Sequence, residues 1–266
     1  MNIIIKKVVL VASPLPPPPV FVGTRLTVRA TPECREFLIK AGDLATGSEA
    51  ICVEWGDGMS DTVTEGIAAL THVYETDGEY VVSISDDVNL LGVTDASGAA
   101  DSARMLIRVF SNAQKLKNFR ASCFAGATNL VDFDFVDTPM TTFGSKLFYG
   151  CTSLRTTGDK WPKGLRSAGI QTFAECTGLE QITIPETCKT LTTNEFWNCT
   201  GLKGRIDLPT IALVGSTMVN NAPFTGCTGI TEIHFSAAYE ESIRSSGGFK
   251  IAPNLGAENA TVFFDL

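Results

Sequence analysis

A seven-residue phrase recurs along the second half of the chain and restricts the possible fold more than any other feature. It consists of a phenylalanine, a small residue three positions later, and a leucine or isoleucine three positions after that. The copies FAGATNL, FYGCTSL, FAECTGL, FWNCTGL and FTGCTGI begin at Phe124, Phe148, Phe173, Phe196 and Phe224, which lie 24, 25, 23 and 28 residues apart. One such unit is too short to bury its own apolar side, so the period predicts coils that stack on one another.

The residues between the phrases keep the same register. Ile182 and Ile184 alternate like a short strand before Pro185, and apolar residues recur three, six and eleven positions after this proline, as they do after Pro162. Each unit therefore predicts one turn of a coil, with a short strand and a tight bend. The extra residues of the longest unit fall in TIALVGSTMVNNAP, where we expect a loop, and a weaker copy, FSNAQKL at Phe110, is interpreted as a first coil or a cap.

The pattern F-x-x-C-T-x-L followed by I-x-I-P resembles the leucine-rich repeats of the BspA-like type. The resemblance covers roughly Phe110 to Phe235 and includes all five strong copies. It implies a right-handed solenoid in which the phenylalanine, cysteine and leucine of each turn point inward. It also implies a role in adhesion.

Four cysteines share one position of the coil, namely Cys151, Cys176, Cys199 and Cys227, and an alanine takes this position in the first strong copy. Since alanine substitutes for cysteine, we expect a small buried group, and a free thiol packs as a small apolar side chain. The spacing lacks the paired C-x-x-C of zinc sites. Disulfides between rungs and metal binding remain alternatives to a ladder of buried thiols. Cys188 occupies a slot that Leu165 fills in another coil.

A different pattern precedes the repeats. AICVEWGDGMSDTV, LTHVYETDGEYVVSISDDV and ARMLIRVF read as short strands separated by turns of glycine and aspartate, which predicts a β-sandwich. W-G-D-G, then H-V-Y, then G-E-Y-V-V-S-I resembles the PKD domain, an immunoglobulin-like sandwich, over about Phe21 to Phe110. The stretch from Glu33 to Ala50 departs from that pattern and is expected to hold a helix or loop insertion. Asp57 is interpreted as a turn residue rather than a metal or catalytic carboxylate, and His72 as a structural residue near Trp55.

The two ends of the chain complete the predicted organisation. Residues 1–20 are expected to form an extended arm with a proline-rich spacer and carry no convincing cleavable signal. The predicted sandwich spans 21–110, the solenoid 111–235 and a cap 236–266, which gives a mainly β fold. In the cap, Tyr239 and Ile243 lie four apart and predict a short helix, and a closing strand follows. This ending also resembles those of phage or prophage proteins with such repeats.

Composition and motifs exclude several classes of function. The net charge is -8, and no basic stripe is present for binding nucleic acid or an anionic membrane. The two histidines fall in different predicted domains, and the chain contains no G-x-S-x-G, phosphate-binding glycine loop or H-E-x-x-H. We therefore predict no enzyme, no catalytic residue, no cofactor and no metal. Asp132 and Asp134 alternate along one strand, and we interpret them as its solvated face rather than as a glycosidase pair or calcium site.

Two aromatic residues are the candidate ligand-binding residues. The second position of the phrase is occupied by alanine, threonine, Tyr149 or Trp197 in different coils, so we expect this column to face outward. Tyr149 and Trp197 would lie two coils apart, roughly 10 Å at the usual strand spacing, and would form a platform for a sugar ring or a protein anchor. Trp161 precedes a proline where other coils have core residues, so it is expected to be buried.

The sequence thus leads to a hypothesis of a non-enzymatic recognition or adhesion protein that binds a cell-surface protein or glycan. The alternative is a structural virion component, attached to a phage tail or capsid through its N-terminal region. A hydrolase is a distant third. The corresponding location is the cell surface or a virion, with no nucleic-acid partner and no membrane insertion.

Overall fold

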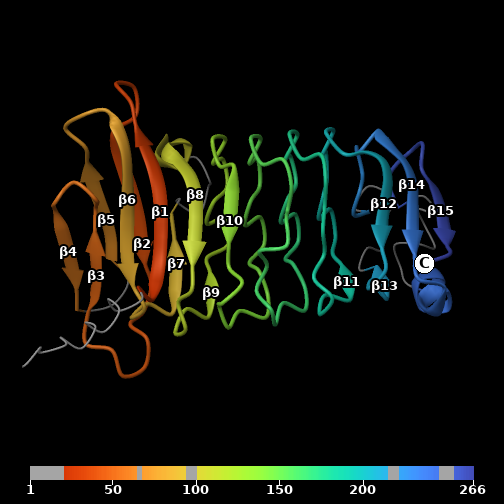
Figure 1. Ribbon diagram of the computed structural model, residues 1–266, viewed down its shortest axis with the longest axis horizontal. Coiled ribbons are helices and arrows are strands. Elements are labelled where there is room, and N and C mark those ends of the chain that lie inside the picture. The colour runs from red at the N-terminus through yellow and green to blue at the C-terminus, as the bar shows by residue number, and fades with distance from the viewer. Residues whose placement is uncertain (1–20, 65–67, 94–100, 215–221, 246–254) are drawn as a thin grey trace, which may run out of the picture.

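The structure is a computed structural model that describes residues 21–64, 68–93, 101–214, 222–245 and 255–266. The predicted arm, residues 1–20, lies outside this part. The described chain is mainly β: strands and coils follow one another along the long axis, and a single short α-helix stands near the C-terminus (Figure 1).

Two sheets form the N-terminal part. The larger sheet runs, in spatial order, β10 (Asp132–Asp134), β8 (Leu106–Ser111), β1 (Gly23–Ala30), β6 (Gly78–Ser85), β3 (Ile51–Glu54) and β4 (Ser60–Val63). The smaller sheet runs β5 (Ala68–Val73), β2 (Glu36–Ala41), β7 (Leu90–Gly92) and β9 (Asn118–Phe119). A short 3-10 helix, Asp101–Met105, leads into β8.

Alternation of side chains decides which face of each sheet is buried. In β1, Leu26 and Val28 are fully buried while the residues between them are more exposed, and in β2 the same holds for Phe37 and Ile39. Both buried faces belong to one hydrophobic cluster, as two packed sheets require. This agrees with the predicted two-layer arrangement, and its identity as an immunoglobulin-like or PKD domain stays a prediction.

One expectation for this part is only partly right: residues 42–50 form a loop, but a strand precedes them. The stretch Glu33–Ala50 was expected to hold a helix or loop insertion, but it contains β2, whose buried Phe37, Ile39 and Ala41 follow the two-residue period of a strand. The smaller sheet would have no centre without it, because β2 pairs with both β5 and β7.

The repeats continue both sheets without a break. β10 pairs in parallel with β8, and β9 pairs in parallel with β7. Side chains also tie the junction: Asn112 Oδ1 accepts from the N–H of Gly23 at 2.9 Å, and the hydroxyls of Thr24 and Ser111 lie 2.9 Å apart. The hydrophobic cluster extends through the junction into the coils. The first coil therefore packs directly on the N-terminal sheets, in agreement with the absence of a flexible linker in the sequence.

Phenylalanines form the spine of the coils. The ring centroids of Phe148 and Phe173 are 5.2 Å apart, those of Phe173 and Phe196 are 5.6 Å apart, and those of Phe196 and Phe224 are 5.4 Å apart, with nearly parallel rings. All four side chains are fully buried. This confirms that the phrase points inward.

The cysteine ladder is buried and hydrogen-bonded. Cys151, Cys176, Cys199 and Cys227 are each 0% exposed and free. Each thiol donates to the carbonyl of the phenylalanine one coil earlier, at 3.3, 3.1, 3.0 and 3.0 Å in that order. Burial raises the pKa of Cys176 to about 12. The predicted buried thiols are confirmed, and they also bond the coils to one another.

Two cysteines outside the ladder differ in their exposure. Cys188 is 2% exposed, in agreement with its predicted apolar slot. Cys52 is exposed and carries a free thiol, so no disulfide joins it to Cys34.

The C-terminal part closes the stack. Here β12 (Lys203–Leu208), β14 (Gly229–Phe235) and β15 (Thr261–Phe264) form a parallel sheet, and β11 (Thr190–Leu191) pairs with β13 (Leu213–Val214). A 3-10 turn, Ala237–Tyr239, leads into α1 (Glu240–Ser245), which buries Ile243. The predicted helix and closing strand are confirmed. Half of the expected loop of the longest unit, residues 215–221 of 210–223, lies outside the described residues, and β13 falls in the described half.

β15 belongs to a shortened final coil rather than to a separate cap. It continues the register of β14 in parallel, and the N–H of Ala260 bonds to the carbonyl of Ala257 at 3.0 Å. Ile230 and Cys227 make the same bond in the preceding coil. Alanines thus occupy the positions where longer coils have cysteine and leucine.

The weak copy at Phe110 is only partly a repeat. Its Ala113 and Leu116 are fully buried, as the phrase requires. Phe110, however, lies in β8 and alternates outward, opposite Arg25 of β1. Its side chain is therefore on the outer face of the larger sheet and not in the phenylalanine spine.

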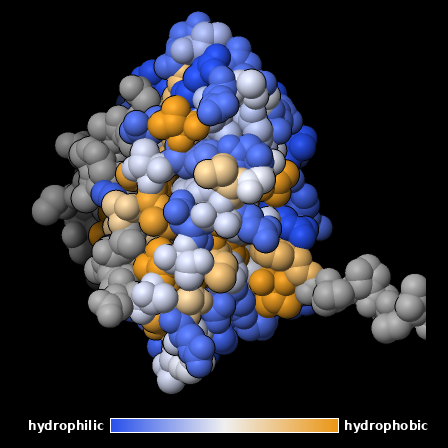
Figure 2. All heavy atoms as spheres, turned by 90° about the vertical axis from the view of Figure 1, so that its left-hand side faces the viewer, coloured by the Kyte–Doolittle hydropathy of each residue, from blue (hydrophilic) through white to orange (hydrophobic). Residues whose placement is uncertain are grey.

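The N-terminal end of the stack carries a mixed surface. Figure 2 shows hydrophobic side chains there scattered among hydrophilic ones. Met59 is 62% exposed and Val73 is 57% exposed. Interspersed polar residues are what a terminal unit of a stack needs, because they oppose end-to-end association.

Candidate functional site

A groove of about 700 Å³ crosses the outer face of the larger sheet where the N-terminal strands meet the first coils. β6, β1, β8 and β10 lie side by side there (Figure 1). Its lining includes Arg25, Thr27, Val81, Ser83, Arg108, Phe110, Asp132, Asp134 and Lys160. Most of these residues take the outward positions of alternating strands whose other face fills the core. The floor of the groove is therefore formed by strands that are hydrogen-bonded to one another.

The two arginines of the groove have no carboxylate partner among the described residues. Arg25 lies over the ring of Phe21, with 4.1 Å from the guanidinium carbon to the ring centroid, and both arginines are exposed. Arg108 lies opposite Thr27, two positions from the partner of Arg25. Diagonal neighbours of this kind are about 7–8 Å apart in a sheet. The two arginines therefore project from neighbouring positions on the same face of the sheet, and Arg108 also lies directly opposite Asp132 of β10.

The carboxylates lie on the solenoid side of the same groove. Asp132 Oδ2 accepts from Lys160 Nζ at 2.9 Å, and this hydrogen bond raises the pKa of Lys160. Asp134 Oδ1 accepts from the backbone N–H of Val136 at 3.3 Å. Within the described chain, the second oxygen of each carboxylate accepts no hydrogen bond. The prediction that Asp132 and Asp134 form a solvated face is confirmed, but that face also borders the groove.

The predicted aromatic pair lies elsewhere, on the turns of the coils, and is half-buried rather than open. Tyr149 and Trp197 flank the coil of Ala174, which is itself 0% exposed. The ammonium group of Lys146 is 5.6 Å from the ring centroid of Tyr149. Burial, together with the charge of Glu175, raises the pKa of Tyr149. The structure therefore places part of each ring against neighbouring coils, and the ligand-binding role of the pair stays a prediction.

Trp161 is 4% exposed and meets Phe133 edge to face, with ring centroids 5.7 Å apart. Its predicted burial is confirmed.

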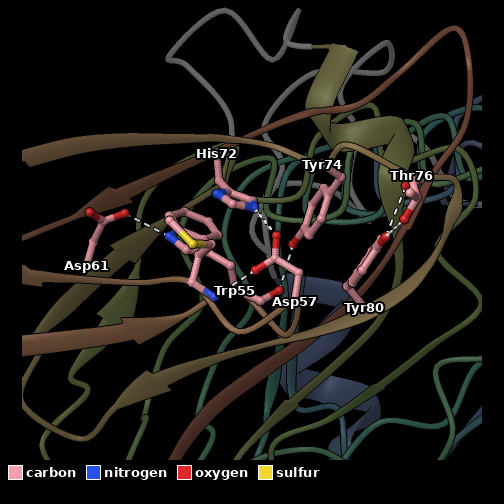
Figure 3. A network of polar contacts seen from close by, with 8 residues as sticks. Trp55, Asp57, Asp61, His72, Tyr74, Thr76 and Tyr80 are labelled. Carbon is pink, nitrogen blue, oxygen red and sulfur yellow. Dashed lines mark hydrogen bonds and ion pairs between the residues drawn. The ribbon is translucent and has the colours of Figure 1, made fainter.

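The W-G-D-G motif builds a structural network (Figure 3). His72 Nε2 lies 2.7 Å from Asp57 Oδ2, and the imidazole stacks on Trp55 with centroids 4.9 Å apart. Trp55 Nε1 donates to Asp61 at 2.7 Å, and the hydroxyl of Tyr74 donates to the Trp55 carbonyl at 2.9 Å. These contacts join β3, the turn after it, β4 and β5.

Asp57 has the electrostatics of a turn residue. Burial raises the pKa of Asp57. The hydrogen bonds from the Met59 N–H, at 3.0 Å, and from His72 lower this pKa by more, so the net shift is downward. Among the described residues, the ring of His72 hydrogen-bonds to Asp57 alone. The pair therefore lacks the nucleophile of a catalytic triad. Both predicted structural roles, Asp57 in a turn and His72 beside Trp55, are confirmed.

The second histidine stands in the C-terminal sheet. His234 is 4% exposed and stacks on Phe263, and its two ring nitrogens face Asp265 Oδ1 at 2.7 Å and Glu232 Oε2 at 3.0 Å. Burial lowers its pKa, but the hydrogen bonds to Asp265 and Glu232 raise it more, so the net shift is upward. The imidazole thus holds the C-terminal residues against β14.

Two other kinds of site have no counterpart in the part of the chain that the structure describes. No group of three or more histidine, cysteine, aspartate or glutamate side chains is placed to hold a metal ion there. No helix there has the length and apolar character needed to cross a membrane.

Comparisons with solved structures find leucine-rich repeat proteins. One is a leucine-rich repeat protein of T. pallidum, 18% identical, with 67% of this chain and 76% of that one covered and a TM-score of 0.44. Another is a leucine-rich repeat protein from Bacteroides ovatus, 14% identical, with coverages of 73% and 67% and a TM-score of 0.31. A third is a leucine-rich cell surface protein from Faecalibacterium prausnitzii, 14% identical, with coverages of 56% and 65% and a TM-score of 0.26.

Among curated proteins, none matches this chain. A family model does match: residues 107–231 correspond to six copies of the BspA type leucine rich repeat region. The matched segment begins in β8 and ends in β14, so it includes the solenoid-side wall of the groove. The coil segment of this protein, residues 107–231, thus matches the BspA-type leucine-rich repeat family, as the spacing of its phenylalanines, cysteines and leucines predicted.

Proposed function

We propose that this protein is a non-enzymatic recognition protein that binds a cell-surface protein or glycan in the groove of its larger sheet. The observation that carries the proposal is the groove itself: an open, mixed polar and apolar concavity on a hydrogen-bonded sheet, with two exposed arginines that form no ion pair with a described carboxylate. Ligand sites are typically concave, with a few convergent polar groups on a preformed scaffold. The BspA-type repeats support the same role, because stacked coils provide an extended surface for binding.

The scaffold also supports a recognition role. Because the sheets of the N-terminal part continue into the coils, a ligand in the groove would contact both parts at once. Such a surface loses little conformational freedom on binding, which favours affinity. The PKD-like assignment of the N-terminal part is proposed on its motifs and its two packed sheets.

A groove-filling variant tests the proposal without assuming the chemistry of the ligand. Ser83 lines the groove from β6, so Ser83→Trp should fill much of it and abolish binding of the purified protein to intact bacterial cells. Thr71→Trp, at an exposed position of β5 in the other sheet, is the matched control and should bind like the parent. Undiminished binding by Ser83→Trp would show that the groove is not the site.

Tyr149→Ala/Trp197→Ala is measured in the same assay. Loss of binding in this double variant alone would move the site to the turns of the coils, as the sequence predicted. If the folded parent binds no cells and instead joins virion particles, the structural alternative replaces recognition. Turnover of a glycan by the parent would contradict the non-enzymatic part of the proposal and favour the hydrolase.

A further inference from the structure

The groove assigns a chemical class to its ligand. We infer that it takes an acidic sugar, a glycan residue that carries both a carboxylate and free hydroxyls. This inference rests on the proposed recognition function and deepens it.

The cations of the groove favour a ligand that carries carboxylate groups. The protein has a net charge of -8, yet three cations and two carboxylates line the groove. Lys160 is held by Asp132, whereas Arg25 and Arg108 form no ion pair with any described residue. A guanidinium group binds a carboxylate with two parallel hydrogen bonds, which gives both strength and orientation. Two arginines at neighbouring positions of β1 and β8, neither of them in an ion pair, therefore favour a ligand with carboxylate groups.

The carboxylates of the groove favour a ligand that also carries hydroxyl groups. Asp132 and Asp134 each keep one oxygen that no described donor occupies, and both oxygens are hydrogen-bond acceptors only. A ligand made solely of anionic groups would be repelled by them, which disfavours phosphate polymers. Sugar hydroxyls, by contrast, donate to carboxylates. The combination of free arginines with free carboxylate oxygens thus matches a molecule that has carboxylates and hydroxyls together.

The remaining lining fits a sugar ring. Phe110 and Val81 provide apolar surface, with Val81 46% exposed, while Thr27 and Ser83 provide hydroxyl groups. Pyranose rings have an apolar face and a polar rim, and side chains of these two kinds serve both. An acidic peptide strand would find no free backbone edge here, because β1, β6 and β8 are paired on both sides within the larger sheet.

The test uses oligogalacturonate and its methyl ester, which differ in the carboxylate charge, together with sialyllactose and lactose. Binding to the full-length protein is measured by calorimetry at two salt concentrations. We expect one acidic member to bind, its uncharged counterpart to bind at least about tenfold more weakly, and the affinity of the acidic member to fall with salt. Binding of oligogalacturonate would identify a uronic acid as the source of the carboxylate, and binding of sialyllactose would identify a sialic acid.

Substitutions of the two arginines test whether the acidic sugar binds in the groove. Arg25→Gln and Arg108→Gln should each reduce affinity for the acidic member by about tenfold and leave the thermal midpoint unchanged, because both side chains are exposed. Arg29→Gln is the matched control: it lies on the outer face of the same strand but pairs with Glu79 outside the groove. Its affinity should equal that of the parent.

Each contrary outcome is informative. Equal affinity for the acid and its ester would overturn the inference, and so would binding of polyglutamate as tight as that of the acidic sugar. If cells are bound and Ser83→Trp abolishes that binding, but none of the acidic sugars binds, the recognition function stands and the ligand class is wrong. If neither cells nor sugars bind, both fail.

Discussion

Glu195 provides the sharpest test of how the coils are packed. Glu195 precedes Phe196, one of the stacked phenylalanines, and the residue is 2% exposed. Oε2 accepts hydrogen bonds from the N–H of Thr192 at 2.8 Å and from its hydroxyl at 3.0 Å, and no described lysine, arginine or histidine pairs with it. Burial without a cation raises the pKa of Glu195 from 4.5 to about 7.

The raised pKa of Glu195 determines how far the free energy of unfolding changes with pH, and in which direction. One pKa unit corresponds to about 1.4 kcal/mol, so a rise from 4.5 to about 7 is worth about 3 kcal/mol. Because the folded protein binds the proton more tightly than the unfolded chain, this contribution is fully present below about pH 4.5. It is lost as the pH rises through about 7, where the buried carboxylate becomes charged.

Glu195→Gln removes the charge and keeps an oxygen that accepts from Thr192. Urea unfolding of parent and variant is measured between pH 4.5 and pH 8. We expect the stability of Glu195→Gln relative to the parent to increase by about 3 kcal/mol across this range. Glu186→Gln, at an exposed position in the preceding coil, should show no such change. A constant difference between Glu195→Gln and parent would refute the burial of this carboxylate and the packing of its coil.

Three further predictions concern the spine and the C-terminus. Cys176→Ala should cost about 1–2 kcal/mol of unfolding free energy, because it removes a weak hydrogen bond and leaves a small cavity. Cys176→Asp should prevent folding, because it buries an unpaired charge. Circular dichroism and urea titration distinguish these results, and an Asp variant that melts like the parent would contradict the inward direction of Cys176. Phe173→Ala should cost about 3–5 kcal/mol in the same titration, because the ring is fully buried between two others, and a cost under about 1 kcal/mol would show that the stacked spine does not exist. Because the pKa of His234 is raised in the folded protein, its contribution to stability is present below the unfolded pKa of 6.5 and is lost as the pH rises. The free energy of unfolding of the parent relative to His234→Gln should therefore decrease with pH. An increase with pH would contradict the raising of this pKa by Asp265 and Glu232.

Local patterns were enough to predict the coils. Each coil repeats its buried positions within about 25 residues, and the contacts that bury them come from the adjacent copies of the same pattern. The inward direction of Phe173 and Cys176, the burial of Trp161 and the turn at Asp57 follow from such local regularities. The hydrogen bond from each thiol to the carbonyl of the preceding coil does not, because sequence spacing carries no information on side-chain rotamers.

The misreadings have physical reasons as well. β2 was missed because the resemblance to a known motif set the expectation for Glu33–Ala50, although Phe37, Ile39 and Ala41 already alternate. Phe110 matches the repeat phrase, but pairing of its strand with β1 turns the ring outward. Tertiary pairing thus overrides a local match when the strand is hydrogen-bonded into a sheet whose other face fills the core.

The residue pattern alone predicts a mainly β chain, a stack of coils with buried phenylalanine and thiol ladders, and a closing helix and strand. The merging of the N-terminal sheets with the first coils depends on the folded arrangement of strands, and so does the groove that brings Arg25, Arg108 and Lys160 together with Asp132 and Asp134. The reason is that burial is encoded locally by hydrophobic period, whereas a binding surface depends on the order of strands in a sheet. That order places residues distant in sequence side by side, and no periodic pattern records it.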